Sequence, residues 1–149
     1  RGNVTRTPDS IIAPYANVGA ANIQFGEPVA YDPDKLGVRK VAAGDTTEQV
    51  IGIAVRRIGQ PYADNDKGWY YAEGDTVDVL LRGSIAVEVA DATGITGRGK
   101  VYVRTSADNA GEIVCSAADG AIEVPNAVFA AGECDASNIA EVTILARSI

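Results

Sequence analysis

One segment constrains the fold of this 149-residue chain more than any other, namely Asp75 to Val89. Its apolar residues alternate with mostly polar ones, which is the two-residue period of a half-buried β-strand. The residues predicted to share the buried face are Val77, Val79, Leu81, Ile85, Val87 and Val89. Gly83 falls on the same face and permits a bend there, whereas Leu80 and Ala86 indicate that part of the other face is also covered. The segment predicts a β scaffold.

Further strands are predicted where short apolar or alternating runs lie between glycine-containing turns. Their ranges are Pro28–Tyr31, Val38–Val41, Val50–Arg57, Lys100–Arg104, Glu112–Cys115, Ala121–Val124, Val128–Ala130 and Glu141–Arg147. Many short strands, frequent glycine turns and no amphipathic helix indicate an all-β fold, either a small barrel or a jelly-roll-like sandwich.

The first 22 residues contain two prolines and show no sustained period, so we predict an extended N-terminal arm over residues 1–22. Residues 23–149 are predicted to form a single barrel or sandwich domain. This domain includes a long, turn-rich and aromatic loop over residues 59–74.

Composition excludes several classes of partner. With 13 basic and 20 acidic residues the formal net charge is −7, which argues against a nucleic-acid partner because phosphate binding needs a basic surface. No apolar run approaches the roughly 18 residues of a membrane span, so we expect a soluble protein that is not exported. Cys115 and Cys134 are expected to be free thiols, with a disulfide between them as the alternative.

The motifs that could carry chemistry are incomplete. Residues 94–100 match the start of a phosphate-binding loop, but Val101 follows where Ser or Thr is required, and a strand is predicted where a helix must begin. Residues 64–66 resemble the opening of a calcium loop, but the glycine is one place early and the final Glu is missing. The chain has no histidine, which disfavours zinc and the usual nucleophile arrangements. We therefore predict no catalytic residue, no metal and no cofactor.

Most of the large aromatic residues gather around the loop at 59–74. They are Tyr62, Trp69, Tyr70 and Tyr71. Exposed Trp and Tyr side chains are typical anchors of an interface, but the same residues could pack as a small core at one end of the barrel. Both alternatives remain open from the sequence.

The order of several short motifs resembles the cement (decoration) proteins of tailed-bacteriophage capsids. The resemblance begins at about Phe25. The motifs that carry it are Gly52–Val55, Gln60–Tyr62, Tyr70–Tyr71, Gly74–Asp75, Val79–Val87, Gly99–Arg104, Pro125–Phe129 and Ala140–Ile144. It implies a structural protein of the virion, made in the bacterial host cytoplasm, that binds the outside of the head and clamps neighbouring major capsid subunits. It also implies self-association, as a dimer or trimer at capsid symmetry axes, and no enzymatic activity.

On this interpretation the N-terminal segment and the aromatic loop are predicted to contact the capsid or a neighbouring subunit. The candidate contact residues are Val4, Arg6, Ile11, Ile12, Tyr15, Tyr62, Trp69, Tyr70 and Tyr71. Two rival hypotheses remain. The aromatic side chains on a β scaffold would also suit a carbohydrate-binding or adhesin module, and the third and weakest hypothesis is an enzyme built on a small barrel.

Overall fold

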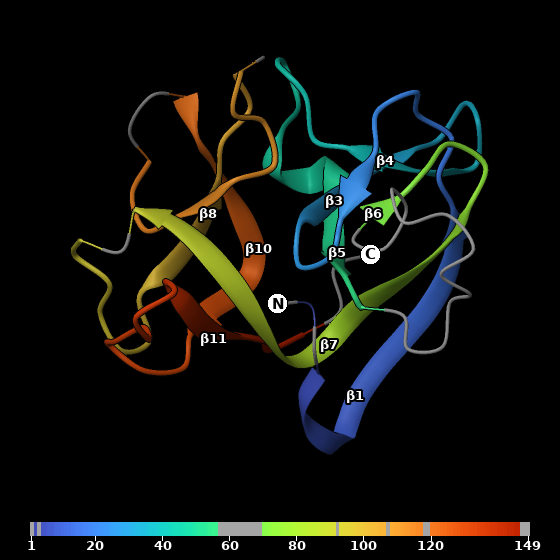
Figure 1. Cartoon of the computed structure of the whole chain (residues 1–149). Coiled ribbons are helices and arrows are strands. Elements are labelled where there is room, and N and C mark those ends of the chain that lie inside the picture. Colours follow the sequence, from blue (N-terminus) through green and yellow to red (C-terminus); the bar gives the residue numbers. More distant parts are fainter. Residues whose placement is uncertain are drawn as a thin grey trace.

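The computed structural model describes residues 2, 4–56, 70–91, 93–106, 108–117 and 120–146, with backbone alone for residues 4–9. Nearly all regular structure is β, and one 3₁₀ turn, η1, lies wholly within these ranges. The strands are β1 (Val4–Ala16), β2 (Ile23–Gln24), β3 (Pro28–Asp32), β4 (Gly37–Lys40), β5 (Val50–Ala54), β6 (Tyr70–Tyr71), β7 (Thr76–Asp91), β8 (Lys100–Val103), β9 (Ile113–Val114), β10 (Ile122–Phe129) and β11 (Ile139–Ile144), and η1 spans Thr47–Gln49. Figure 1 shows their arrangement.

Strand β7 is the spine of the molecule. Ser84 and Ile85 pair with β1 and also with β11, so these two strands lie on opposite edges of β7. One edge of β7 carries β1 and then the parallel strand β9, and the other carries β5 and then β11. The two ends of this one strand therefore organise different groups of partners.

The pairings define two lobes. In the C-terminal lobe, β7, β11, β10, β8 and β9 pair in a closed ring. In the N-terminal lobe, β1, β7, β5, β3 and β4 pair in succession, and a bridge between Asn17 and Val38 connects β4 back to the end of β1. The short β2–β6 sheet completes this lobe. Figure 1 shows the C-terminal lobe on the left and the N-terminal lobe on the right, joined by β7. The predicted all-β barrel class is confirmed.

One face of β7 is buried along most of its length, and Leu80 on the other face is buried as well, in a different core. Val77, Val79 and Leu81 pack in a cluster of the N-terminal lobe. Leu80 instead joins Ile85, Val87 and Val89 in the larger cluster that fills the C-terminal lobe and reaches β3 and β5. The predicted apolar face is thus buried throughout, and it serves one core before Gly83 and another after it. Gly83 has φ 125°, a backbone conformation that side chains other than glycine rarely adopt.

The structure does not confirm the predicted extended N-terminal arm. Residues 4–16 form β1, which pairs antiparallel with β7 from Ile85 to Thr76. Its pairing is interrupted by three register shifts, and these destroy the alternating pattern that would identify a strand in the sequence. Pro14 is tolerated because β1 pairs on only one side along most of its length.

The other strand predictions hold, with two differences. The two strands predicted at 121–124 and 128–130 are a single strand, β10, whose pairing with β8 shifts register between Glu123 and Val128. Within this irregular stretch Asn126 has φ 59°. The short strands β2 and β6 were not predicted because two residues are too few to show a period. The predicted ends at Arg57 and Arg147 lie outside the described residues.

Close packing of β5 against β7 predicts the effect of a small substitution at Gly52. A Cβ at this position would overlap the carbonyl oxygen of Leu80 and lie 2.7 Å from Cγ1 of Val79. Because the overlap is with backbone, we expect Gly52→Ala to lower the free energy of unfolding by roughly 3 kcal/mol. Urea denaturation measures this. Gly97→Ala is the matched control, since the atom nearest to its Cβ would be 3.6 Å away, and an equal loss in both variants would contradict the packing argument.

Candidate interaction surface

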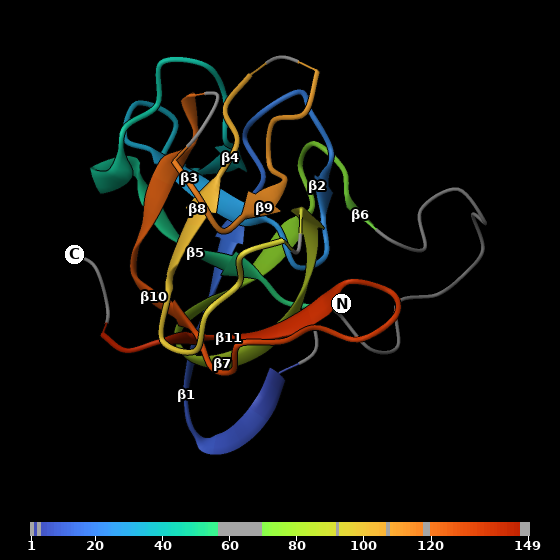
Figure 2. The same cartoon turned by 90° about the vertical axis from the view of Figure 1, so that its left-hand side faces the viewer.

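The most prominent surface feature is an excursion of β1, which we call the β1 finger (residues 4–12). Arg6 lies opposite Ser84 and Ile11 opposite Arg82, so β1 advances five residues while β7 advances two. The extra residues have no partners on β7 and must leave the sheet. Figures 1 and 2 show the resulting curl of β1 projecting from the lower end of the molecule.

The β1 finger is anchored where the chain begins. The N–H of Gly2 donates to the carbonyl oxygen of Ala86 at 2.7 Å, and the carbonyl of Gly2 accepts from the N–H of Arg56 at 2.7 Å. Gly2 has φ 78°, and a Cβ there would lie 2.9 Å from Cβ of Phe25. Only glycine suits this position, and its two backbone hydrogen bonds hold the start of the finger against the rest of the fold.

Asn17, just after β1, fixes the other end. Its side chain is buried, and its Nδ2 donates to the carbonyl oxygens of Tyr71 at 3.2 Å and Ala21 at 3.3 Å. Its backbone N–H donates to Asp75 O at 2.9 Å. The finger is therefore a tethered loop and not a free end.

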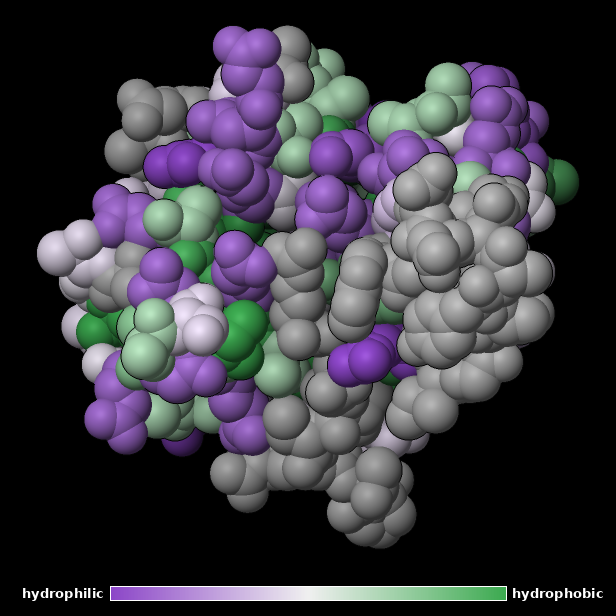
Figure 3. All heavy atoms as spheres, in the orientation of Figure 1, coloured by the Kyte–Doolittle hydropathy of each residue, from purple (hydrophilic) through white to green (hydrophobic). Residues whose placement is uncertain are grey.

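Two of the predicted contact residues are exposed on the finger. Ile11 is 39% exposed and Ile12 is 44% exposed, two of the four large apolar side chains that are exposed in the described residues. The other two are Leu36, in the β3–β4 turn of the N-terminal lobe, and Leu145, just after β11. Figure 3 shows that hydrophilic residues otherwise cover much of the described surface in this view. An adjacent pair of exposed isoleucines is thus a distinctive feature of the finger.

The remaining residues predicted on the N-terminal segment fall into two groups. Val4 and Arg6 pair through their backbones with Ile85 and Ser84, and their side chains lie outside the description. Tyr15 is half-buried; its ring meets that of Tyr31 edge to face at 6.2 Å and packs against the N-terminal core. Tyr15 therefore supports the base of β1.

The aromatic residues of the predicted loop divide between core and surface. Tyr71 is fully buried, its ring lies 5.1 Å from that of Phe25, and its hydroxyl donates to Val55 O at 2.5 Å. The interpretation of Tyr71 as a surface contact is corrected, since its side chain belongs to the core. Tyr70 is half-buried on β6. Tyr62 and Trp69 lie outside the described residues.

A groove that the sequence did not reveal runs beside the base of the finger. Its volume is about 400 Å³, and it crosses the outer side of β7, β11 and β10. Its lining includes Arg82, Ser84, Arg98, Glu141 and Leu145. The hydroxyls of Ser84 and Thr143 join across its floor at 2.9 Å. Because its lining comes from four distant parts of the chain, no local motif could have marked it.

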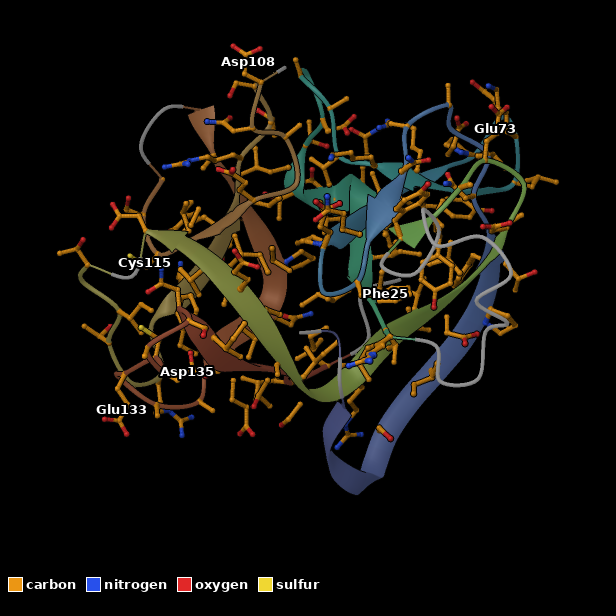
Figure 4. All side chains as sticks on the ribbon, in the orientation of Figure 1. Phe25, Glu73, Asp108, Cys115, Glu133 and Asp135 are labelled. Carbon is orange, nitrogen blue, oxygen red and sulfur yellow. The ribbon has the colours of Figure 1, made fainter. Side chains whose placement is uncertain are left out.

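A larger cavity of about 600 Å³ lies where the two lobes meet. Figure 4 marks two residues of its lining, Phe25 near the centre and Asp108 at the top. Lys40 lies 3.7 Å from Glu27, and Arg104 lies 2.7 Å from Glu112, so two of its carboxylates have cationic partners. Each of these two ion pairs lies within one lobe, so each lobe contributes a paired carboxylate to the cavity.

The motifs considered for chemistry have structural explanations. Lys100 begins strand β8, so the glycine-rich run before it is a turn leading into a strand, as predicted. The calcium-like residues 64–66 lie outside the described part. Among the residues that are described, no group of three or more potential ligand side chains could hold a metal ion, and no helix is long and apolar enough to cross a membrane. Cys115 and Cys134 are free.

Comparison with known proteins identifies the family. The family model described as structural cement protein (E217 gp24/Pam3 gp6) matches residues 1–145. The chain belongs to this structural cement protein family. It is therefore a structural protein of a phage capsid, located in the virion, as the resemblance in the sequence indicated.

A solved structure with the same fold agrees with this membership. A chain of "The capsid of Myoviridae Phage XM1" superposes with a TM-score of 0.76 at 21% sequence identity, covering 97% of this chain and 88% of that one. At this identity the likeness establishes the fold alone. No curated protein matches the sequence.

One ion pair of this cement protein gives its stability a pH dependence. Arg39 donates to both oxygens of Asp45, each at 2.7 Å. Burial alone would raise the pKa of Asp45, but hydrogen bonds from Arg39 and the N–H of Ala42, with the charge of Arg39, outweigh it and hold the pKa below its usual value. Because the pKa is lowered in the folded state, the ion pair contributes fully to the free energy of unfolding above about pH 4. This contribution is lost as the pH falls through the folded-state pKa.

We expect Asp45→Asn to lower the free energy of unfolding by about 1 kcal/mol at pH 7. The difference from wild type should begin to shrink below about pH 4, where the unfolded chain takes up the proton first, and should vanish once the pH is below the folded-state pKa as well. Thermal unfolding of both proteins between pH 7 and pH 2.5 measures it. A difference that stays constant across this range would contradict the assignment.

Proposed function

We propose that the protein binds the outer surface of the phage head and clamps neighbouring major capsid subunits together. The observation that carries the proposal is the β1 finger, a projecting, tethered element that presents Ile11 and Ile12 to solvent. Family membership supplies the structural role. The finger supplies a surface on this chain that a capsid subunit can cover.

The geometry of the finger suits tight attachment. Both of its ends are held by backbone hydrogen bonds, at Gly2 and at Asn17. A loop that is already ordered loses little conformational entropy when it binds. Many copies attach to one head, so modest individual contacts add to a large stabilisation of the shell. Self-association as a dimer or trimer would increase this effect, and a purely mechanical role requires no catalysis.

The proposal is tested by sedimenting the purified protein with heads of the matching phage that lack it. We expect saturable binding and a higher rupture temperature of the decorated heads. The control is unassembled major capsid protein, in which neighbouring subunits are absent. A protein that clamps neighbours should bind it more weakly than it binds heads. Absence of binding to assembled heads would refute the proposal, and equal binding to unassembled protein would refute the clamping of neighbours.

A further inference from the structure

An arginine occupies a backbone conformation that favours glycine, at the rim of the groove beside the finger. The N–H of Gly99 donates to Thr96 O at 2.9 Å and closes a four-residue turn, in which Arg98 is the third residue with φ 64°. A positive φ at the third position of a turn is normally met by Gly or Asn, because a larger side chain is strained there. An arginine at this position therefore lowers the stability of the fold relative to Gly or Asn.

The turn is held firmly in place. The N–H of Arg98 donates to Phe129 O at 2.8 Å, and the N–H of Phe129 donates to Gly99 O at 2.9 Å. A Cβ at Gly99 would lie 2.5 Å from Oγ1 of Thr96, so the turn leaves no room for a side chain beside Arg98. These contacts fix the backbone of Arg98 against β10, so the side chain extends from a rigid backbone.

The side chain of Arg98 is exposed, and no ion pair joins it to another described residue. Among the described residues of the lining, the other charged ones are Arg82 and Glu141. The exposed guanidinium of Arg98 therefore adds a positive charge to the groove of a protein whose net charge is −7. Such a site complements an acidic partner.

The groove is also continuous with the finger. Arg82, in the groove lining, lies opposite Ile11 in the β1–β7 register, and Ser84, also in the lining, lies opposite Arg6. The finger and the groove are therefore adjacent on the surface, and a partner that covers Ile11 and Ile12 would also reach the groove. The apolar finger and the groove form one surface.

We propose that this groove takes an acidic segment of the major capsid protein, with the Arg98 guanidinium paired to one of its carboxylates. The proposal rests on the proposed function and specifies the chemistry of the partner at the same surface. An arginine that pairs with a carboxylate through two hydrogen bonds gives both attraction and orientation. The strained turn then serves binding and not folding.

The test compares Arg98→Asn, Arg98→Asp and Arg98→Lys with wild type in sedimentation with undecorated heads. Asn and Asp tolerate positive φ, so neither variant should melt below wild type. We expect affinity to fall about tenfold for Asn and about 100-fold for Asp, as for an interface arginine, while Lys, which keeps the charge but not the paired hydrogen bonds, lies between wild type and Asn. Raising the salt concentration should weaken wild type more than Arg98→Asn.

Leu36→Asp is the matched control. Leu36 is 74% exposed and also has a positive φ, 56°, but lies in the N-terminal lobe. The control and Arg98→Asn each change the net charge from −7 to −8. We expect the control to bind like wild type.

Each other outcome decides against the inference. Wild-type affinity of Arg98→Asn and Arg98→Asp would overturn it, and an equal loss in Leu36→Asp would assign the effect to net charge. If Arg98→Asn changes self-association in analytical ultracentrifugation but leaves head binding unchanged, the groove binds a second copy of this chain and not the capsid. If wild type itself does not bind heads, it is the proposed function that fails.

Discussion

Replacing both Ile11 and Ile12 with serine should weaken attachment to phage heads about 100-fold and leave the protein folded. The two side chains are 39% and 44% exposed in the free protein. Covering the exposed part of each would contribute roughly 1 to 1.5 kcal/mol, and the two together about 2 to 3 kcal/mol, which corresponds to on the order of 100-fold in affinity. Saturation binding to undecorated heads measures the affinity, and thermal unfolding of the free protein measures its stability.

Leu36→Ser provides the control for this experiment. It removes an apolar side chain that is 74% exposed, but from the β3–β4 turn in the N-terminal lobe. We expect it to bind heads like wild type. Unchanged binding of the double isoleucine variant, or an equal loss in the Leu36 variant, would contradict the role of the finger.

The largest expected effect on stability is at Tyr71. Tyr71→Ala should lower the free energy of unfolding by about 3 to 5 kcal/mol, because it leaves a large cavity against Phe25 and removes the hydroxyl bound to Val55 O. Tyr71→Phe keeps the ring and loses only the hydrogen bond, so it should cost about 1 to 2 kcal/mol. Urea denaturation measures both.

The neighbouring residue is a control for Tyr71. Tyr70 lies on the same short strand but is only half-buried. We expect Tyr70→Ala to cost clearly less than Tyr71→Ala. A Tyr71→Ala protein that kept wild-type stability but failed to bind heads would return Tyr71 to the surface and contradict its place in the core.

The sequence predicted the central strand because the burial of β7 follows a simple two-residue period. Leu80 broke that period, and the structure explains it, since β7 contributes to two cores. The period alone could not show this division. Whether a residue faces one lobe or the other depends on partners such as β5 and β11, which are distant in the sequence.

The strand in the N-terminal segment was not predicted, for a related reason. Strand β1 is recognised by its pairing with β7, and the register shifts after Val4, Arg6 and Ile11 leave no regular pattern of side chains. Its lack of a core pattern nevertheless drew attention to Ile11 and Ile12, which are indeed exposed.

The groove was missed because its residues are adjacent only in the folded chain. Arg98 appeared in the sequence only as part of an incomplete phosphate-binding motif. Its positive φ and its place beside β10 become visible only in the structure. For the aromatic residues, composition left core and surface open. Tyr71 was resolved by its burial and its hydrogen bond to Val55.

An electron cryo-microscopy map of heads saturated with this protein tests the central claim most directly. The account predicts the protein on the outer surface, with the β1 finger against the shell and each copy contacting two neighbouring major capsid subunits. A map in which Ile11 and Ile12 face solvent, or in which each copy touches only one subunit, would contradict it.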